Sequence, residues 1–234
     1  MKKAICVINT FFNYEHIQRC FNSIYSSNVD FFILENKSKY SDKIKDFFID
    51  KNVLGYLQFQ ENVTHFSVDT FLKEYRDLIF QYEYLIITDG DLEIENIEDT
   101  YNEIFNILNE PNVIVCTVDL LLDNLPTKRF PESVNWVPKS INNGKFLIGN
   151  SGTHLLTVKN NNFDVIFENN AIMDTIIYQS VLKRQGIWAR TLINKAYHLT
   201  WDYYVEGNEY LEWKLKNQWT LGSHNKKSEY IKII

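Results

Sequence analysis

Over the first 120 residues, unbroken apolar runs alternate with segments whose apolar residues recur at helical spacing. Parallel strands need crossover connections, and strands that are covered on both faces read as continuous apolar runs. The alternation therefore predicts an α/β fold, with a mostly parallel sheet flanked by helices. The predicted strands are Ala4–Ile8, Val29–Leu34, Tyr56–Phe59, Tyr84–Thr88 and Val113–Val118. The clearest predicted helix between them carries Val68, Phe71, Leu72, Tyr75, Leu78 and Ile79 on one face.

The second half of the chain has a different character. All four prolines fall between residues 111 and 138, and they mark a long irregular region. Beyond it we expect a helix over Ile172–Arg184, which Gly186 could terminate. The predicted strands of this half are Lys145–Ile148, His154–Val158, Phe163–Phe167 and Ile187–Ile193.

Composition narrows the class of protein. The chain has 24 basic and 30 acidic residues and a net charge of -6, which argues against nucleic acid as the main partner. Its apolar runs are far shorter than the roughly 20 residues needed to cross a bilayer, and the N-terminus lacks the pattern of a secretory signal. We therefore expect a cytoplasmic protein. Three widely spaced thiols are expected to be core residues: Cys6, Cys20 and Cys116.

Two carboxylates follow the strand Tyr84–Thr88 directly. Asp89 and Asp91 flank Gly90, and ligands of open α/β sheets bind beyond the carboxyl ends of the strands. Carboxylate oxygens suit Mg²⁺ or Mn²⁺, and a glycine permits close approach of the backbone. The segment predicts a cation site at this edge of the sheet. A solvated Asp-Gly turn is the alternative interpretation.

Three segments, in order, resemble the nucleotide-binding half of GT-A fold glycosyltransferases, especially the family-2-like group. They are Cys6–Phe11, Phe32–Ser38 and Ile86–Asp91. That group carries a strand ending in Pro-Thr-Tyr-Asn, a strand ending in Asp-Asn-x-Ser, and an Asp-x-Asp motif. Here Asn9 replaces the usual proline and Glu35 the usual aspartate.

The resemblance implies a metal-dependent glycosyltransferase that moves a sugar from a nucleoside-diphosphate sugar to a hydroxyl acceptor in bacterial-type glycan synthesis. Inversion is the expected stereochemical course, and retention is the alternative, because retaining GT-A enzymes share the Asp-x-Asp strand. It implies Mn²⁺ or Mg²⁺ as cofactor, because a divalent cation neutralises the charge of the leaving diphosphate. The implied partners are the nucleotide-sugar donor and a glycan or lipid-linked acceptor. The chain would form a single GT-A domain, 1–234. Residues 1–120 would bind the nucleotide sugar, 121–213 would supply the acceptor and catalytic half, and 214–234 would form a basic tail.

The resemblance also assigns residues to the donor and the metal. The donor-binding set is Thr10, Phe11, Glu35, Asn36, Asp89, Gly90 and Asp91. Within it, Glu35 and Asn36 are alternatives for contact with the base edge. Asp89 would meet the ribose or the metal, and Asp91 would meet the metal. His198 resembles the histidine near the metal in many GT-A enzymes, which makes it the candidate third ligand.

The catalytic base is assigned in the same way. Ala171–Gly186 resembles the family helix at whose start an aspartate serves as the base of inverting transfer, and this implies Asp174. An aspartate that only interacts with free backbone amides is the alternative. Gly149 and Asn150 resemble a Gly-rich segment on the acceptor side. Aromatic candidates for stacking on a sugar are Trp136, Trp188, Trp201 and Tyr203, of which Trp201 is assigned to the acceptor side.

Two other functions remain open at the level of sequence. A haloacid-dehalogenase-type phosphohydrolase also places Asp-x-Asp after a buried strand, and a non-catalytic domain could bind a nucleotide sugar without turnover. The tail from Lys214 onward carries five lysines and one glutamate, a net charge of +4. Both a basic tail in solution and peripheral docking at the inner membrane face fit this charge.

Overall fold

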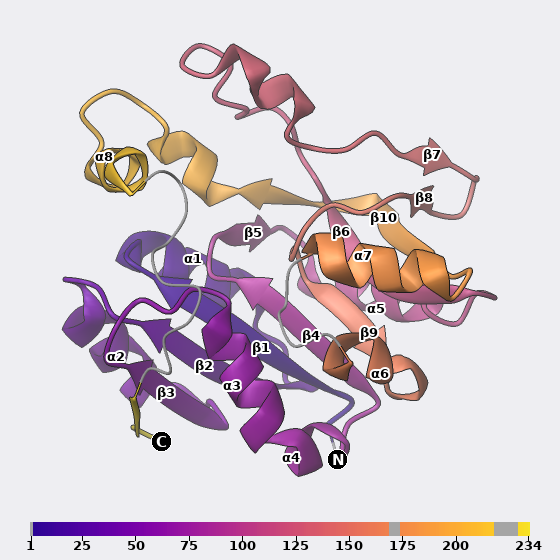
Figure 1. Ribbon diagram of the computed structural model, residues 1–234, viewed down its shortest axis with the longest axis horizontal. Coiled ribbons are helices and arrows are strands. Elements are labelled where there is room, and N and C mark those ends of the chain that lie inside the picture. The colour runs from indigo at the N-terminus through magenta and orange to yellow at the C-terminus, as the bar shows by residue number, and fades with distance from the viewer. Residues whose placement is uncertain (1, 169–173, 218–228) are drawn as a thin grey trace.

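The computed structural model describes residues 2–168, 174–217 and 229–234, which form one 11-stranded sheet with helices on both faces (Figure 1). This confirms the predicted α/β class. The strands are β1 (Ala4–Phe11), β2 (Val29–Asn36), β3 (Gly55–Phe59), β4 (Tyr84–Asp89), β5 (Leu92–Ile94), β6 (Val113–Leu120), β7 (Ile141–Asn142), β8 (Leu147–Ile148), β9 (Leu156–Lys159), β10 (Ile187–His198) and β11 (Tyr230–Lys232).

The sheet is parallel through its N-terminal half and mixed beyond it. The spatial order is β11-β3-β2-β1-β4-β9-β6-β10-β8-β7, and β5 pairs with β10. Strands β3, β2, β1 and β4 run parallel, as do β6 and β10. Strand β9 lies antiparallel between β4 and β6, so it joins the two halves. The carboxyl ends of β1, β2 and β4 therefore meet at one edge of the sheet.

Helices cover the two faces and produce two hydrophobic cores. The first core contains residues of α1, α2 and α5, and the second contains residues of α3, α4, α6 and α7. Figure 1 shows α3, α4, α6 and α7 in front of the sheet. The helices are α1 (Tyr14–Ile24), α2 (Ser41–Ile49), α3 (Phe66–Glu74), α4 (Arg76–Ile79), α5 (Ile97–Ile107), α6 (Asp164–Phe167), α7 (Asp174–Lys183) and α8 (Glu209–Lys216).

Alternation along the strands decides which polar side chain faces which core. Along β1, Cys6 and Ile8 belong to the first core, whereas Ile5 and Val7 belong to the second. Because side chains alternate between faces, Asn9 continues the row of the second core. By the same count Asn36 on β2 and Asp89 on β4 lie on that side, while Thr10 and Glu35 lie on the other.

Several predicted elements differ from the observed ones. Phe163–Phe167 was predicted as a strand, and this is wrong, because Asp164–Phe167 forms helix α6. The helix predicted around Val68–Ile79 is two helices, α3 and α4, separated at Tyr75. Helix α8 and strands β5, β7 and β11 were not predicted. Among the described residues, no helix combines the length and apolar character needed to cross a membrane.

Some of the predicted segments lie only partly within the described residues. Ala171–Met173, at the start of the predicted base helix, lie outside them, as do residues 218–228 of the basic tail. The described part of the tail is the end of α8 and strand β11. All three cysteines are buried and free, as predicted.

Candidate active site

Asn9 and Asp89 lie side by side where β1 and β4 end. They are register partners, and Asn9 Nδ2 donates a 3.2 Å hydrogen bond to Asp89 Oδ1. Asn9 Oδ1 accepts hydrogen bonds from Asn36 Nδ2 at 2.7 Å and from Ser67 Oγ at 2.9 Å. Thr153 Oγ1 donates to the second oxygen of Asp89 at 2.9 Å. Both carboxylate oxygens of Asp89 are therefore oriented by donors.

Gly90, between the two aspartates, leaves no room for a side chain without displacing its neighbours. A Cβ atom added at Gly90 would lie 3.2 Å from Ile17 Cγ1 and 3.3 Å from Thr10 Cγ2, closer than ordinary van der Waals contact. The Gly90 amide donates to Asn9 O at 3.0 Å, and the Leu199 amide donates to Asp91 O at 2.8 Å. These contacts fix Asp91 beside the end of β10.

The environments of the two aspartates push their pKa values apart. Burial raises the pKa of Asp89 to about 6, and the charge of Asp91 adds to this, against the hydrogen bonds from Thr153 and Asn9. Burial also acts to raise the pKa of Asp91. His198 and a 2.7 Å hydrogen bond from Thr200 Oγ1 outweigh it, so this pKa lies below its usual value. Asp91 is the more firmly ionised of the two, as a cation ligand should be.

Two histidines lie near Asp91. His198 Nε2 is 3.6 Å from Asp91 Oδ2, and its ring stacks on Trp201 with centroids 4.5 Å apart. The centroid of the His154 ring lies 5.6 Å from that of His198. Burial lowers the pKa of His154 to about 3, with a further contribution from His198, so His154 is neutral. The Nδ1 atoms of both rings are buried and have no hydrogen-bond partner within the described ranges.

The residues predicted to hold a metal are neighbours with suitable chemistry. Asp89 and Asp91 supply carboxylate oxygens, the donors that Mn²⁺ and Mg²⁺ prefer, and His198 adds an imidazole nitrogen. Across residues 2–168, 174–217 and 229–234, no group of three His, Cys, Asp or Glu side chains is already arranged to hold a metal ion. Ligands from a bound substrate would be needed to complete such a site.

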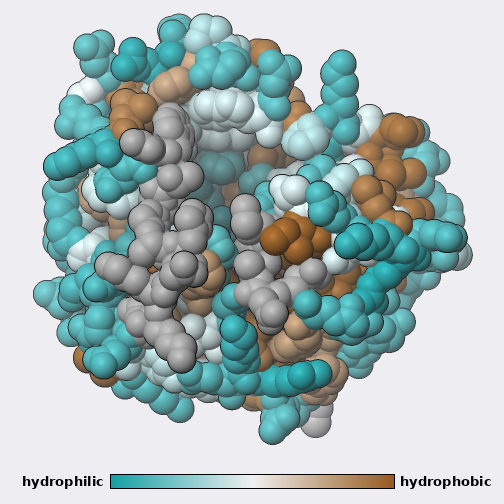
Figure 2. Space-filling model, viewed as in Figure 1, coloured by the Kyte–Doolittle hydropathy of each residue, from teal (hydrophilic) through white to brown (hydrophobic). Residues whose placement is uncertain are grey.

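A cavity of about 690 Å³ opens beside the two aspartates, within the size range of small-molecule sites. The face drawn in Figure 2 is hollowed in this region. One wall is aromatic: the ring centroids of Phe11 and Trp213 lie 4.7 Å from each other. The lining residues are Asn9, Phe11, Asn13, Asn36, Asn62, Thr64, His65, Asp89, Gly90, Asp91, Phe130, Glu132, Trp136, His198, Thr200, Trp201, Tyr204, Tyr210, Trp213 and Lys214.

A second, smaller cavity connects Asp89 with the predicted base. Its volume is about 210 Å³, and its lining residues are Asn9, His65, Val68, Ile87, Asp89, Thr153 and Asp174. Asp174 begins helix α7, as the sequence predicts, and its charge contributes to the raised pKa of Asp89. Asn9, His65 and Asp89 line both cavities. Asp89 therefore stands between the larger cavity and Asp174.

Several predicted site residues lie outside these cavities. Thr10 is buried and donates to Leu34 O at 3.3 Å, and Glu35 is buried and accepts from Ser41 Oγ at 2.7 Å. Of the alternatives Glu35 and Asn36, only Asn36 lines the cavity. Gly149 and Asn150 line neither cavity.

The aromatic candidates separate in the same way. Trp136 and Trp201 line the larger cavity. Trp188 is a core residue whose Nε1 donates to Thr117 Oγ1 at 3.1 Å. Tyr203 packs against His16 instead, with ring centroids 3.8 Å apart and the two rings tilted by 33°. Of the predicted stacking residues, Trp136 and Trp201 are therefore the two that line the cavity beside the aspartates.

Sequence reasoning missed the contribution of α8. Tyr210, Trp213 and Lys214 all line the cavity, at i, i+3 and i+4 of this helix. That spacing was visible in the sequence, as was Asn208, which accepts hydrogen bonds from the Tyr210 and Leu211 amides as the N-cap. Assigning Lys214 to a basic tail concealed the pattern.

Solved structures show which fold this is. The mannosyltransferase PcManGT from Pyrobaculum calidifontis, in complex with GDP-Man and Mn²⁺, matches with a TM-score of 0.59 and 11% identity, over 93% of this chain and 61% of that chain. S. aureus TarS 1-349, in complex with UDP-GlcNAc, matches with a TM-score of 0.55 and 13% identity, over 84% and 58%.

A third solved structure is a CMP:2-keto-3-deoxy-manno-octonic acid synthetase complexed with CTP. It matches with a TM-score of 0.52 and 10% identity, over 94% of this chain and 100% of that chain. At these identities the likeness concerns the fold alone. The chain has the GT-A-like fold found among enzymes that use nucleotide sugars or make them.

Sequence relatives come from a virus. Uncharacterized protein L142 of Acanthamoeba polyphaga mimivirus is 32% identical over 237 residues, which cover 92% of this chain and 48% of that protein. Uncharacterized protein L137 of the same virus is 30% identical over 249 residues, covering 98% and 34%. The chain thus spans half or less of the length of these curated relatives. No family model matches the sequence.

Proposed function

We propose that this chain is a glycosyltransferase domain that moves a sugar from a nucleoside-diphosphate sugar to a hydroxyl acceptor in glycan synthesis. The observation that carries the proposal is the position of Asp89 between two cavities. The larger cavity, with Asp91 and an aromatic wall, suits a nucleotide, and the smaller one contains Asp174. A sugar attached to the nucleotide would then lie near Asp89, with its anomeric carbon open to attack from the side of Asp174.

Asp174 would act as the base of an inverting reaction. Its carboxylate accepts the proton of the acceptor hydroxyl while the hydroxyl oxygen forms a bond to the anomeric carbon. The bond from that carbon to the diphosphate oxygen breaks, and the nucleoside diphosphate leaves with the electron pair. Asn9 and Thr153 keep Asp89 oriented during this step through their hydrogen bonds.

Asp91, His198 and Asp89 are the residues that would hold Mn²⁺ or Mg²⁺, with donor phosphates as the remaining ligands. The mannosyltransferase with a similar fold was solved with Mn²⁺, which supports this part of the proposal. The cation would neutralise the charge that develops on the leaving diphosphate.

The experiment is a calorimetric titration of the folded protein with UDP, GDP and CDP in the presence of Mn²⁺, followed by assays of sugar release from the matching nucleotide sugars. We expect one nucleotide to bind and its sugar conjugates to turn over. Absence of binding by all three nucleotides would overturn the proposal. Binding without turnover of any sugar conjugate would favour a non-catalytic nucleotide-sugar-binding domain.

A second candidate function is nucleotidyl transfer. The likeness to a synthetase complexed with CTP over 94% of this chain favours it. Such an enzyme joins a nucleotide to a sugar and releases pyrophosphate from a nucleoside triphosphate. Pyrophosphate release from CTP, UTP or GTP in the presence of sugar acids or sugar phosphates would establish this function, and its absence would remove it.

Location in the cytoplasm and docking of the basic tail at the inner membrane face also stay proposals. Co-sedimentation with vesicles that contain anionic lipid would test the docking. Binding that does not depend on anionic lipid, or no binding, would contradict it.

A further inference from the structure

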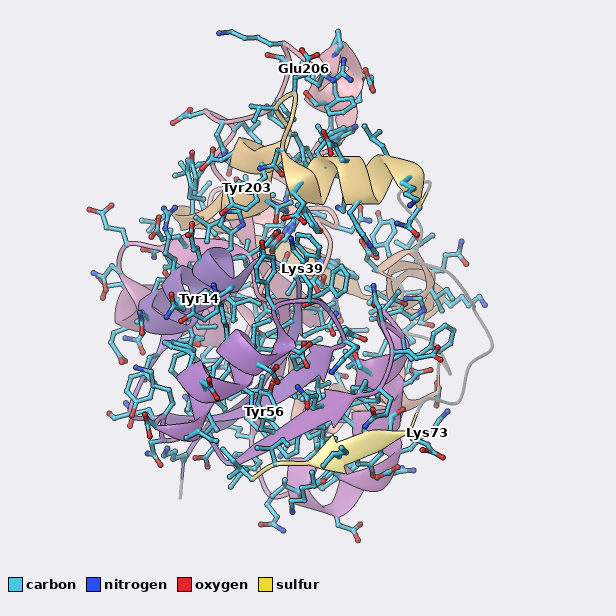
Figure 3. All side chains as sticks on the ribbon, turned by 90° about the vertical axis from the view of Figure 1, so that its left-hand side faces the viewer. Tyr14, Lys39, Tyr56, Lys73, Tyr203 and Glu206 are labelled. Atoms are coloured by element: carbon cyan, nitrogen blue, oxygen red, sulfur yellow. The ribbon has the colours of Figure 1, made fainter. Side chains whose placement is uncertain are left out.

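Helix α8 contacts residues that follow strands β1 and β2 in the N-terminal half of the chain. The Glu209 carboxylate forms an ion pair with Lys39 and accepts a 3.1 Å hydrogen bond from the Tyr40 hydroxyl. Figure 3 shows Lys39 directed towards this helix. At the next residue, the ring of Tyr210 packs on Phe12 with ring centroids 5.5 Å apart. The helix is thus held over the edge of the sheet where the aspartates lie.

The ammonium group of Lys214 places a positive charge at the larger cavity. Its Nζ donates a 2.7 Å hydrogen bond to the Tyr204 hydroxyl and lies 5.3 Å and 5.2 Å from the ring centroids of Tyr204 and Tyr210. Burial lowers the pKa of Lys214, while the charges of Asp91 and Asp89 oppose that shift and favour the ammonium form. Lys214 in turn contributes to the lowered pKa of Asp91. The lysine and the two aspartates therefore interact within one cavity.

The neighbours of Lys214 indicate what this cation would bind. Trp213, the preceding residue, contacts Phe11 and belongs to the aromatic wall that could stack on a nucleobase. Lys214 lies towards Tyr204 and the aspartates, where the diphosphate of such a nucleotide would extend. Asp89 and Asp91 repel a diphosphate, so a cation at this place offsets an unfavourable interaction. An ammonium group is a compact charge with three donors, which suits phosphate oxygens.

We propose that Lys214 Nζ binds a phosphate group of the nucleotide donor, which makes α8 part of the donor site. The proposal rests on the function proposed above and adds a protein cation to the phosphate side of that site. In this arrangement Trp213 and Lys214 contact the base and the phosphates from one helix. Diphosphate binding then depends on α8 as well as on the Asp-Gly-Asp segment.

The experiment measures binding of UDP, GDP and CDP, and of the corresponding nucleosides, to wild-type protein and to Lys214→Met, Lys214→Arg and Lys216→Met. Methionine keeps much of the apolar stem of lysine and removes its charge. Lys216 is exposed on the same helix and provides the matched control. Circular dichroism and thermal unfolding establish that each variant is folded. Titrations in EDTA, alongside those with Mn²⁺, separate the contribution of the lysine from that of a metal.

For the diphosphate that wild type binds, we expect Lys214→Met to weaken binding about tenfold or more, with and without Mn²⁺. The nucleoside should bind Lys214→Met within about twofold of wild type, Lys214→Arg should retain most of the diphosphate affinity, and Lys216→Met should match wild type. Equal diphosphate affinity of Lys214→Met and wild type would overturn the inference. An equal loss of nucleoside and diphosphate affinity would also overturn it, because the lysine would then only hold α8 in place. If wild type binds no diphosphate, the proposed function itself fails.

Discussion

The side-chain amide of Asn9 donates a 3.2 Å hydrogen bond to Asp89 Oδ1 across the paired ends of β1 and β4. Asn9 occupies the position at which the resembling family usually has proline. Proline has no side-chain donor, so this bond belongs to the present sequence. The same amide accepts hydrogen bonds from Asn36 and Ser67, which tie β2 and α3 to the first aspartate.

We predict that Asn9→Ala lowers both stability and activity. The substitution removes a buried acceptor from Asn36 and Ser67, which should lower the free energy of unfolding by about 1–3 kcal/mol. It also removes a hydrogen bond that favours the ionised form of Asp89, whose pKa already stands at about 6. The pH profile of sugar release should therefore shift to higher pH. Asn102→Ala, at an exposed position on α5, is the control, and equal behaviour of the two variants would contradict the prediction.

Asp91→Asn should remove the effect of divalent cations on nucleotide binding. Asp91 is the aspartate with the lowered pKa, and it lies 3.6 Å from His198 Nε2. Loss of its charge should abolish the gain in affinity that Mn²⁺ gives to wild type and reduce sugar release about 100-fold or more. Calorimetry with and without Mn²⁺ is the measurement. Glu95→Gln, exposed just beyond β5, should keep the full Mn²⁺ effect. A Mn²⁺ effect that survives in Asp91→Asn would place the cation elsewhere.

Asp174→Asn should separate binding from chemistry. Asp174 lines the smaller cavity and is absent from the lining of the larger one, so nucleotide affinity should stay within about twofold of wild type. Transfer to the acceptor should fall by about 10²–10⁴-fold if the carboxylate is the general base. Asp123→Asn, exposed and remote in sequence, controls for the change in net charge. Transfer at the wild-type rate would leave Asp174 as a helix-start residue only.

Glu35 predicts a pH dependence of stability. Burial raises its pKa from 4.5 to about 7, against the hydrogen bond from Ser41. Because the folded pKa lies above the unfolded one, the unfolded state loses its proton first as the pH rises. The free energy of unfolding should therefore fall between about pH 4.5 and pH 7, by about 3 kcal/mol.

Glu35→Gln keeps the shape of the side chain and removes its charge. The variant should be more stable than wild type at pH 8 and equal to it at pH 4, measured by urea unfolding at each pH. Asp89, whose pKa is also raised, contributes to the pH dependence of both proteins and cancels in the comparison. A constant difference between the two proteins over this range is the result that would sink the prediction.

The sequence predicted the sheet edge well because apolar strands and their polar ends are local signals. It predicted Asp89, Gly90 and Asp91 at that edge, with His198 next to them. Strand alternation, applied to β1 and β2, would also have separated Phe11 and Asn36, which line the cavity, from Thr10 and Glu35, which face the other core. The site residues were assigned by matching family motifs, and the alternation of side chains along the strands was not applied to them.

The contribution of α8 to the cavity was harder to predict. Tyr210, Trp213 and Lys214 reach the aspartates only because the chain returns across the sheet edge after β10. No local pattern relates position 214 to position 91. The resemblance assigned Gly149 and Asn150 to the acceptor side. Neither residue lines the two cavities beside Asp89, whereas Thr153, three residues after Asn150, donates a hydrogen bond to Asp89.

Strand β11 pairs antiparallel with β3 along the outer side of the sheet, and the Gln60 and Ile233 amides extend the pairing at its two ends. Without it, a row of backbone donors and acceptors on β3 would face solvent, and such rows recruit extended segments from other molecules. The new outermost strand is only three residues long and carries Lys232, whose charge discourages further addition. Residues 229–234 therefore cover the edge of β3. Protein truncated at residue 228 should be more prone to aggregate, even though it keeps both aspartates.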